Sequence, residues 1–349
     1  MRWRRATVTD GAGPAAPPEV FRPGSRERPA DHHRGDGGPP PRLDDGATEA
    51  VLRKLQLLVT RRLDGLLQGD HLGLLPAVGS EAGESREYRP GDDVRRMDWP
   101  VTARTTVPHV RQTVADRELE TWVCLDLSAS LDFGTARCEK RDLAVAAAAA
   151  VTHLTVRGGN RTGAVLATGT GIVRIPARGG RQNAQGMMRR IVETPRARPG
   201  VQTDLAAAID ALNRPPRRRG MAVVISDFLT PDLDGSSPLS WERPLRRLGV
   251  RHDVLAVEVV DPRELELPDV GVLTVTDTET GRVHEVQTAD RKFRQRYAEA
   301  AAAQRDTIAA SLRRAGAGHL RLRTDSDWLL DIVRFVAAQR RGHTRGTTR

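Results

Sequence analysis

The sequence predicts an α/β protein built on a doubly wound, mostly parallel sheet, preceded by a charged N-terminal segment of short strands and loops. From about residue 119, apolar strand-like runs alternate with helical segments, an order typical of parallel sheets covered by helices on both faces. Polar residues follow two of these runs where each strand should leave the sheet, which is the edge at which such folds bind ligands. A chain of 349 residues with 38% hydrophobic residues can bury a large core.

Both ends of the chain are predicted to be disordered. Residues 1–45 are rich in Pro, Gly and Arg and show no apolar periodicity, so their folding would not offset the loss of chain entropy. His32 and His33 lie in this tail and are interpreted as solvated side chains rather than metal ligands. Residues 341–349 form a short basic tail.

Residues 46–118 are predicted to contain a helix followed by the charged segment. Between residues 48 and 66, leucines recur near helical spacing with arginines between them, which indicates an amphipathic helix packed on its own domain. From Gly79 to Glu120 charge is dense and turn signals interrupt the chain. We favour an ion-pair network anchored by Trp99 for this segment over a charged binding surface. The leucines of the helix are Leu52, Leu55, Leu58, Leu63 and Leu66.

Residues 119–340 are predicted to form the main domain, in which helices and strands alternate. A hairpin over 271–287, turning near Thr280-Gly281, interrupts this alternation. The predicted strands are 121–127, 161–168, 171–177, 221–228, 251–260 and 319–324, and the predicted helices are 140–156, 181–193, 203–212, 238–248, 289–315 and 326–340.

Five oxygen-bearing residues are the candidate site. Asp126, Ser128 and Ser130 alternate just past the first strand, Thr203 stands at a helix start, and Asp227 ends an apolar strand. Because neighbouring parallel strands end at the same edge of a sheet, these side chains are expected to gather there. Hard oxygen donors of this kind suit Mg²⁺.

A purely structural role is the alternative for this loop. The two serines would then cap the following helix or turn while Asp126 binds backbone amides. If Asp126 instead serves a metal at the surface, Asp126→Ala is expected to leave the fold largely intact.

The stretch DLSAS at 126–130 resembles the DxSxS signature of von Willebrand factor A-type domains. Thr203 and Asp227 match the order and rough spacing of the remaining ligands of their metal-ion-dependent adhesion site. The upstream block EYRPGDDVRRMDWPVTAR resembles the motif of the domain-of-unknown-function-58 family, bacterial proteins whose second half is such a domain. The resemblance covers about residues 79–260 and extends more weakly to 340.

The resemblance implies a non-enzymatic, metal-dependent protein-binding module. Asp126, Ser128, Ser130, Thr203 and Asp227 would hold Mg²⁺, or else Mn²⁺ or Ca²⁺, and an acidic residue of a partner would complete the metal's coordination. Relatives are often encoded beside MoxR-type AAA+ ATPases, which implies an adaptor or chaperone-like role with such an ATPase. Many relatives carry two transmembrane helices before the charged block, whereas no apolar run here approaches the ~20 residues that span a bilayer.

An enzyme is the rival class. Asp126 as nucleophile could support a Mg²⁺-dependent phosphotransferase or phosphatase reaction. Such enzymes usually place a second carboxylate two residues further on, and that position is Ser128 here. The sequence also shows no phosphate-binding GxxxxGK[ST] loop and no zinc-spaced His/Cys cluster, so no catalytic residue is assigned.

The net charge of +10 raises a third possibility, an anionic partner such as nucleic acid. Nearly all of the charge is arginine, gathered partly at 215–220 and in the C-terminal tail, and aromatic residues amount to only 3%. Little material for base stacking is therefore present, and specific nucleic-acid binding is not expected. Cys124 and Cys138 are interpreted as a buried thiol and an incidental one, consistent with a reducing compartment. We expect a cytoplasmic protein.

Overall fold

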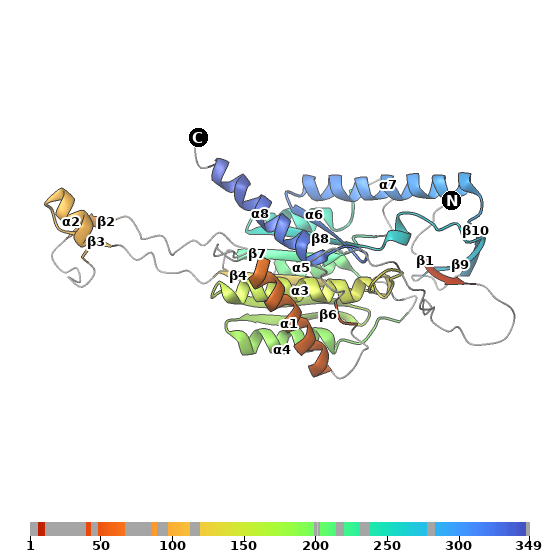
Figure 1. Cartoon of the computed structure of the whole chain (residues 1–349), viewed down its shortest axis with the longest axis horizontal. Coiled ribbons are helices and arrows are strands. Elements are labelled where there is room, and N and C mark those ends of the chain that lie inside the picture. The colour runs from red at the N-terminus through yellow and green to blue at the C-terminus, as the bar shows by residue number, and fades with distance from the viewer. Residues whose placement is uncertain are drawn as a thin grey trace.

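The centre of the molecule is a six-stranded sheet with helices on both faces (Figure 1). The computed structural model describes residues 6–10, 40–42, 48–66, 85–88, 97–111, 119–198, 201, 203–213, 220–230, 238–277 and 283–346.

The strand order confirms the predicted doubly wound sheet. Five strands are parallel, and β6 at one edge runs antiparallel to β5. From β4 the chain first adds β5 and β6 on one side of that strand, and later adds β7, β8 and β11 on the other side. The direction of winding therefore reverses between β4 and β7. Such a reversal is where open α/β sheets bind ligands. The order is β11 (Gly318–Arg323), β8 (His252–Val260), β7 (Gly220–Ser226), β4 (Glu120–Leu127), β5 (Arg161–Thr168) and β6 (Gly171–Arg178).

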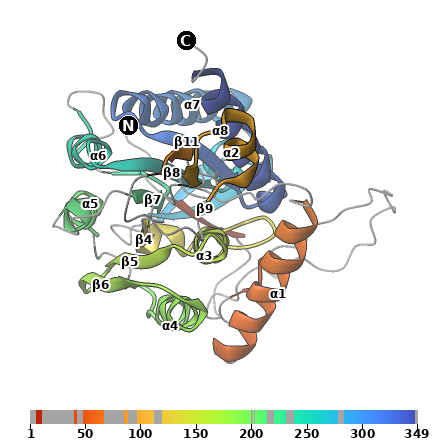
Figure 2. The same cartoon turned by 90° about the vertical axis from the view of Figure 1, so that its left-hand side faces the viewer.

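Helices lie on both faces of the sheet (Figure 2), and an apolar layer packs between the sheet and the helices on each face. Along β4, Val123 and Leu125 enter one layer while Trp122 and Cys124 enter the other, because side chains alternate along a strand. Strands buried on both faces become continuously apolar, which is why they were recognisable in the sequence. One layer includes α1 (Thr48–Leu66), α3 (Lys140–Arg157), α4 (Arg181–Val192) and α8 (Trp328–Gly346), and the other includes α5 (Leu205–Asn213), α6 (Glu242–Gly249) and α7 (Arg291–Arg314).

Helix α1 packs on the main domain, although its buried face differs from the predicted leucine stripe. Leu52 and Leu58 are only half-buried. Residues spaced by four lie above one another on a helix. The buried face of α1 is such a row, consists of two valines and two leucines, and packs against α3, α4 and α8. Between residues 48 and 63, the part of α1 whose side chains the structure describes, the buried residues are Val51, Leu55, Val59 and Leu63.

The hairpin is confirmed as β9 (Val272–Asp277) and β10 (Val283–Gln287), and its expected turn lies outside the described residues. A further strand, β1 (Ala6–Asp10), pairs antiparallel with β9, where the sequence predicted no structure. Its ATVTD sequence has β-branched residues, and the free edge of β9 offers unpaired backbone groups to it. His32 and His33 also lie outside the described residues.

The charged segment forms short elements, as expected. Strands β2 (Ser85–Glu87) and β3 (His109–Arg111) pair antiparallel, and α2 (Trp99–Thr105) lies between them in the chain. Trp99 is not an apolar anchor, because it opens α2 and is 67% exposed.

The C-terminal helix is longer than the sequence predicts. Helix α8 continues to Gly346, past the expected end near Arg340. Most of the arginine-rich stretch at 215–220 lies outside the described residues. Among the helices that the structure describes, none is long and apolar enough to cross a membrane.

Candidate functional site

The structure brings Asp126, Ser128 and Ser130 together at the end of β4. The Ser128 amide donates to Asp126 Oδ1 at 2.9 Å, and the hydroxyls of Ser128 and Ser130 share a hydrogen bond of 2.8 Å. All three residues are buried. The backbone contact of Asp126 agrees with the structural alternative, but Ser128 makes no side-chain cap on the short 3-10 helix Ala129–Leu131. Its hydroxyl faces Ser130 instead.

Ser226 connects this loop to the neighbouring strand β7. Its hydroxyl donates to Asp126 Oδ2 at 2.7 Å and accepts a hydrogen bond from the amide of Phe228 at 3.0 Å. Sequence reasoning missed this residue. The available signal was a small polar side chain at the end of an otherwise apolar strand, next to an aspartate already selected.

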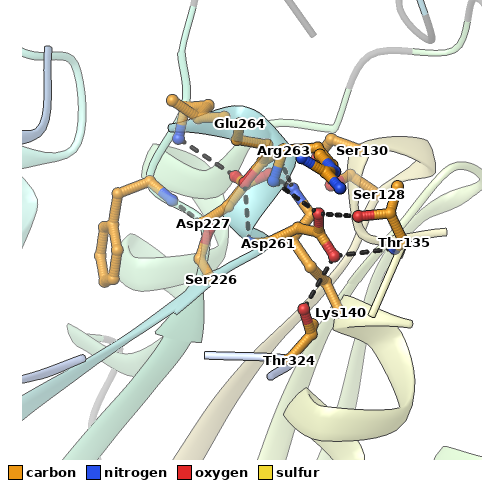
Figure 3. Close-up of polar contacts among 12 residues, drawn as sticks. Ser128, Ser130, Thr135, Lys140, Ser226, Asp227, Asp261, Arg263, Glu264 and Thr324 are labelled. Carbon is orange, nitrogen blue, oxygen red and sulfur yellow. Dashed lines mark hydrogen bonds and ion pairs between the residues drawn. The ribbon is translucent and has the colours of Figure 1, made fainter. Parts of the chain in front are cut away.

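Asp227 follows β7 and lies in a buried ion pair. Lys140 Nζ donates to Asp227 Oδ2 at 3.0 Å and also pairs with Glu264, as Figure 3 shows. The other carboxylate oxygen of Asp227 accepts the Leu229 amide at 3.1 Å. The sequence pattern predicted a metal-ligand role for Asp227 and no role for Lys140.

The backbone just past Asp227 is held in an unusual conformation. Phe228 has a φ of 55°, in the left-handed region that costs a non-glycine residue about 1–3 kcal/mol. Its fully buried ring packs edge-on against Trp241 with centroids 5.2 Å apart. Arg305 Nη1 also donates to the carbonyl oxygen of Asp227 at 3.1 Å. These contacts fix the direction of the Asp227 side chain.

A buried charge network extends outward from Arg305. Its guanidinium pairs with Glu258 at 3.2 Å and with Glu264 at 3.1 Å. Glu258 also binds His319 and Arg321, each at 2.8 Å. Burial alone would raise the pKa of Glu258, but the hydrogen bond from His319 and the charges of the two arginines lower it below the ordinary value.

Asp261, at the end of β8, holds the loop after Ser130 in place. Its carboxylate accepts the Thr135 amide at 2.8 Å, the Thr135 hydroxyl at 2.6 Å and the Thr324 hydroxyl at 2.7 Å. Figure 3 shows it between segments that are far apart in the chain. It is fully buried, so it acts as a positioning residue for the candidate site.

The two aspartates of the site differ in how their charge is compensated. Burial, and after it the charge of Asp227, raises the pKa of Asp126, and the hydrogen bonds from Ser226 and Ser128 oppose that rise. Burial lowers the pKa of Lys140, but the charges of Asp227 and Glu264 outweigh it and leave that pKa raised. Within the described part of the chain, Asp126 has hydroxyl and amide donors and no ion-pair partner.

This donor set fits a hard cation. Adjacent oxygens of an octahedral Mg²⁺ at about 2.1 Å lie about 3.0 Å apart, close to the 2.8 Å between the two serine hydroxyls. Asp126 supplies a carboxylate beside them. No group of three or more His, Cys, Asp or Glu side chains suited to a metal occurs among the described residues, so a site here would consist of hydroxyls with few carboxylates.

Thr203 is placed at the same edge by topology. It lies two residues before α5, which leads into the start of β7 and packs on β4 and β5. The start of α5 therefore lies where those strands end. Thr203 is half-buried, and we assign it no bond to Asp126, Ser128 or Ser130.

The strand order, the antiparallel edge strand and the Asp-Ser-Ser loop at the winding reversal define a von Willebrand factor A-like domain. A family model described as "Protein of unknown function DUF58" matches residues 84–307. The chain belongs to this family.

Two proteins of mycobacteria are similar to this chain over half of its length or more. The protein Rv1480 of Mycobacterium tuberculosis H37Rv is 60% identical over 304 residues, which cover 87% of this chain and 93% of the relative. The protein MAV169 of Mycobacterium avium is 53% identical over 175 residues, which cover 50% and 99%.

Solved structures are similar at much lower identity. The conserved hypothetical protein BatB from Bacteroides thetaiotaomicron is 14% identical with a TM-score of 0.37, over 64% of this chain and 99% of that one. A von Willebrand factor type A protein from Catenulispora acidiphila is 13% identical with a TM-score of 0.31, over 44% and 35%. The fold assignment follows from the strand order and the family.

Proposed function

We propose that this protein is a metal-dependent protein-binding module whose site binds an acidic side chain of a partner. The observation that carries the proposal is a buried carboxylate, with no ion-pair partner among the residues that the structure describes, beside two hydroxyls 2.8 Å apart at the winding reversal of the sheet. Asp126, Ser128 and Ser130 would hold Mg²⁺, or else Mn²⁺ or Ca²⁺. A divalent cation bound mainly by neutral hydroxyls keeps positive charge available to a partner's carboxylate.

The chain's own residues prepare this site. Ser226 orients the Asp126 carboxylate, and Asp261 fixes the loop through Thr135. Both carboxylate oxygens of Asp126 already accept hydrogen bonds, and Asp126 is only 4% exposed. This favours a binding role over phosphoryl transfer, in which Asp126 would attack as a free nucleophile.

The partner that we propose is a MoxR-type AAA+ ATPase, with this protein as adaptor or chaperone-like component. Family resemblance supports this step, because no single residue of the site selects one partner. The two buried, free cysteines are compatible with the reducing cytoplasm, where the proposal places the protein.

The test removes one hydroxyl from the site and leaves the carboxylate in place. Ser130→Ala is preferable to Asp126→Ala, because Asp126 accepts a hydrogen bond from Ser226 on the neighbouring strand and its loss also disturbs the fold, whereas the side-chain hydrogen bond of Ser130 stays within its own loop. We expect Mn²⁺ binding, measured by calorimetry, to weaken at least about tenfold. Thr307→Ala is the control, since that hydroxyl bonds the Ala303 carbonyl within α7.

The partner is tested by affinity purification from the native host with Mg²⁺ present. We expect an AAA+ ATPase to be recovered with the wild type and with Thr307→Ala, but not with Ser130→Ala or in chelator. Equal recovery in all four samples would rule out the site as the binding determinant.

A further inference from the structure

We propose that Lys140 is a built-in counter-ion that removes Asp227 from the metal-ligand set and thereby limits the affinity of the site for divalent cations. Of the five predicted ligands, Asp126, Ser128, Ser130 and Thr203 would then remain. This inference rests on the proposed metal site and departs from the five-residue ligand set that the sequence predicts.

Asp227 differs from Asp126 in that one of its donors is a charged ammonium, whereas the donors to Asp126 among the described residues are neutral hydroxyl and amide groups. Oδ2 accepts from Lys140 Nζ at 3.0 Å and Oδ1 from the Leu229 amide at 3.1 Å. The carbonyl oxygen accepts from Arg305 at 3.1 Å. The Lys140 side chain is 0% exposed and that of Asp227 is 1% exposed, so water does not weaken their attraction.

The position of Lys140 in the fold is explained by the carboxylates and not by its helix. It is the first residue of α3, where the positive end of the helix dipole disfavours a cation. Two carboxylates, those of Asp227 and Glu264, hold the ammonium there. A lysine that is fully buried needs such partners.

Removal of the Lys140 charge would make Asp227 available. Asp227 lies near enough to Asp126 for its charge to be felt there. Without the ammonium, two carboxylates would face one cation-binding loop, and repulsion between the ammonium and a bound cation would disappear. Divalent cations should then bind more tightly.

The chain supplies its own controls for this test. Its three lysines are Lys54, Lys140 and Lys292, and Lys54 and Lys292 are exposed. Calorimetric titration of the full chain with Mn²⁺ would compare the wild type with Lys140→Met, Lys54→Met and Lys292→Met. We expect Lys140→Met to bind at least about tenfold more tightly, and the two control variants to match the wild type.

A double variant tests whether Asp227 is a ligand in the wild type. Lys140→Met/Asp227→Asn removes both charges of the pair and leaves no uncompensated charge from it. We expect it to bind Mn²⁺ within about twofold of the wild type. The double variant also tests whether Asp227 is a ligand if Lys140→Met alone does not fold. A loss as large as that in Ser130→Ala would show that Asp227 is a ligand and overturn the inference.

The remaining outcomes separate this inference from the proposed function. If the wild type binds Mn²⁺ through Ser130 and Lys140→Met binds no more tightly, the inference fails and the proposed site stands. If only Lys140→Met binds Mn²⁺, the inference stands and metal dependence of the natural protein fails. Binding by neither form overturns both.

Discussion

At the scale of single residues, Asp261 links the end of β8 to two segments from distant parts of the chain. Its carboxylate accepts hydrogen bonds from Thr135 and Thr324. Asp261→Asn replaces one acceptor oxygen by an amide that can only donate. Because Asp261 and Thr324 are buried and a buried group that loses its hydrogen-bond partner is not rescued by water, we expect the free energy of unfolding to fall by about 1–3 kcal/mol.

Denaturant unfolding measures this change, and hydrogen exchange at the Thr135 amide should speed up with it. Asp253→Asn is the control, since Asp253 lies on the same strand and is exposed. Its effect should stay within about 0.5 kcal/mol. Equal effects of the two variants would contradict the positioning role of Asp261.

Whether a residue of the site could be predicted depends on how far it lies along the chain from its contacts. Asp126, Ser128 and Ser130 could be predicted to converge because they share one short loop. Lys140, Glu264 and Arg305 could not, because the sequence does not tell which of many charged residues meet after folding. The burial of Asp126 was missed for the same reason, since it depends on Ser226 and the following loops.

At the scale of elements, α1 depends on one apolar face. Leu63 is fully buried, whereas Leu57 on the same helix is 47% exposed. We expect Leu63→Ala to lower the free energy of unfolding by about 2–5 kcal/mol, because it leaves a cavity against the main domain. Leu57→Ala, the matched control, should change it by less than about 0.5 kcal/mol. Thermal and denaturant unfolding of both variants checks this, and similar losses would mean that α1 does not pack as described.

The strands of the sheet were predictable because each buried strand is mostly apolar, with only a few polar residues such as Glu258 in β8. Strand β1 was not, since five residues in a polar tail become a strand only when β9 offers an edge. Trp99 was misjudged because its burial depends on tertiary contacts that the local pattern does not contain.

At the scale of the whole molecule, the charges around Glu258 join the last strand of the sheet to α7. The lowered pKa of Glu258 means that its ionised form stabilises the fold above the ordinary value of 4.5, and that this contribution is lost as the pH falls through the lower, folded value. We therefore expect the stability of the wild type to decrease below about pH 4.5.

Glu258→Gln tests this pH dependence. At pH 7 it should cost about 3–5 kcal/mol, because Arg305 loses a buried counter-charge. Below pH 4.5 the difference from the wild type should shrink, and unfolding curves measured from pH 7 to pH 3 follow both effects. A constant difference across this range would contradict the assignment.

Because the chain is synthesised from its N-terminus, the contacts that fix the Asp227 turn can form only late in translation. The left-handed conformation of Phe228 is supported by Trp241 and by Arg305, and the loop after Ser130 is held through Asp261 by Thr324. All of these partners leave the ribosome after the DLSAS loop. A nascent chain that stops short of Thr324 therefore lacks the contacts that fix the site, so a growing chain acquires its binding site only when most of its length has been translated.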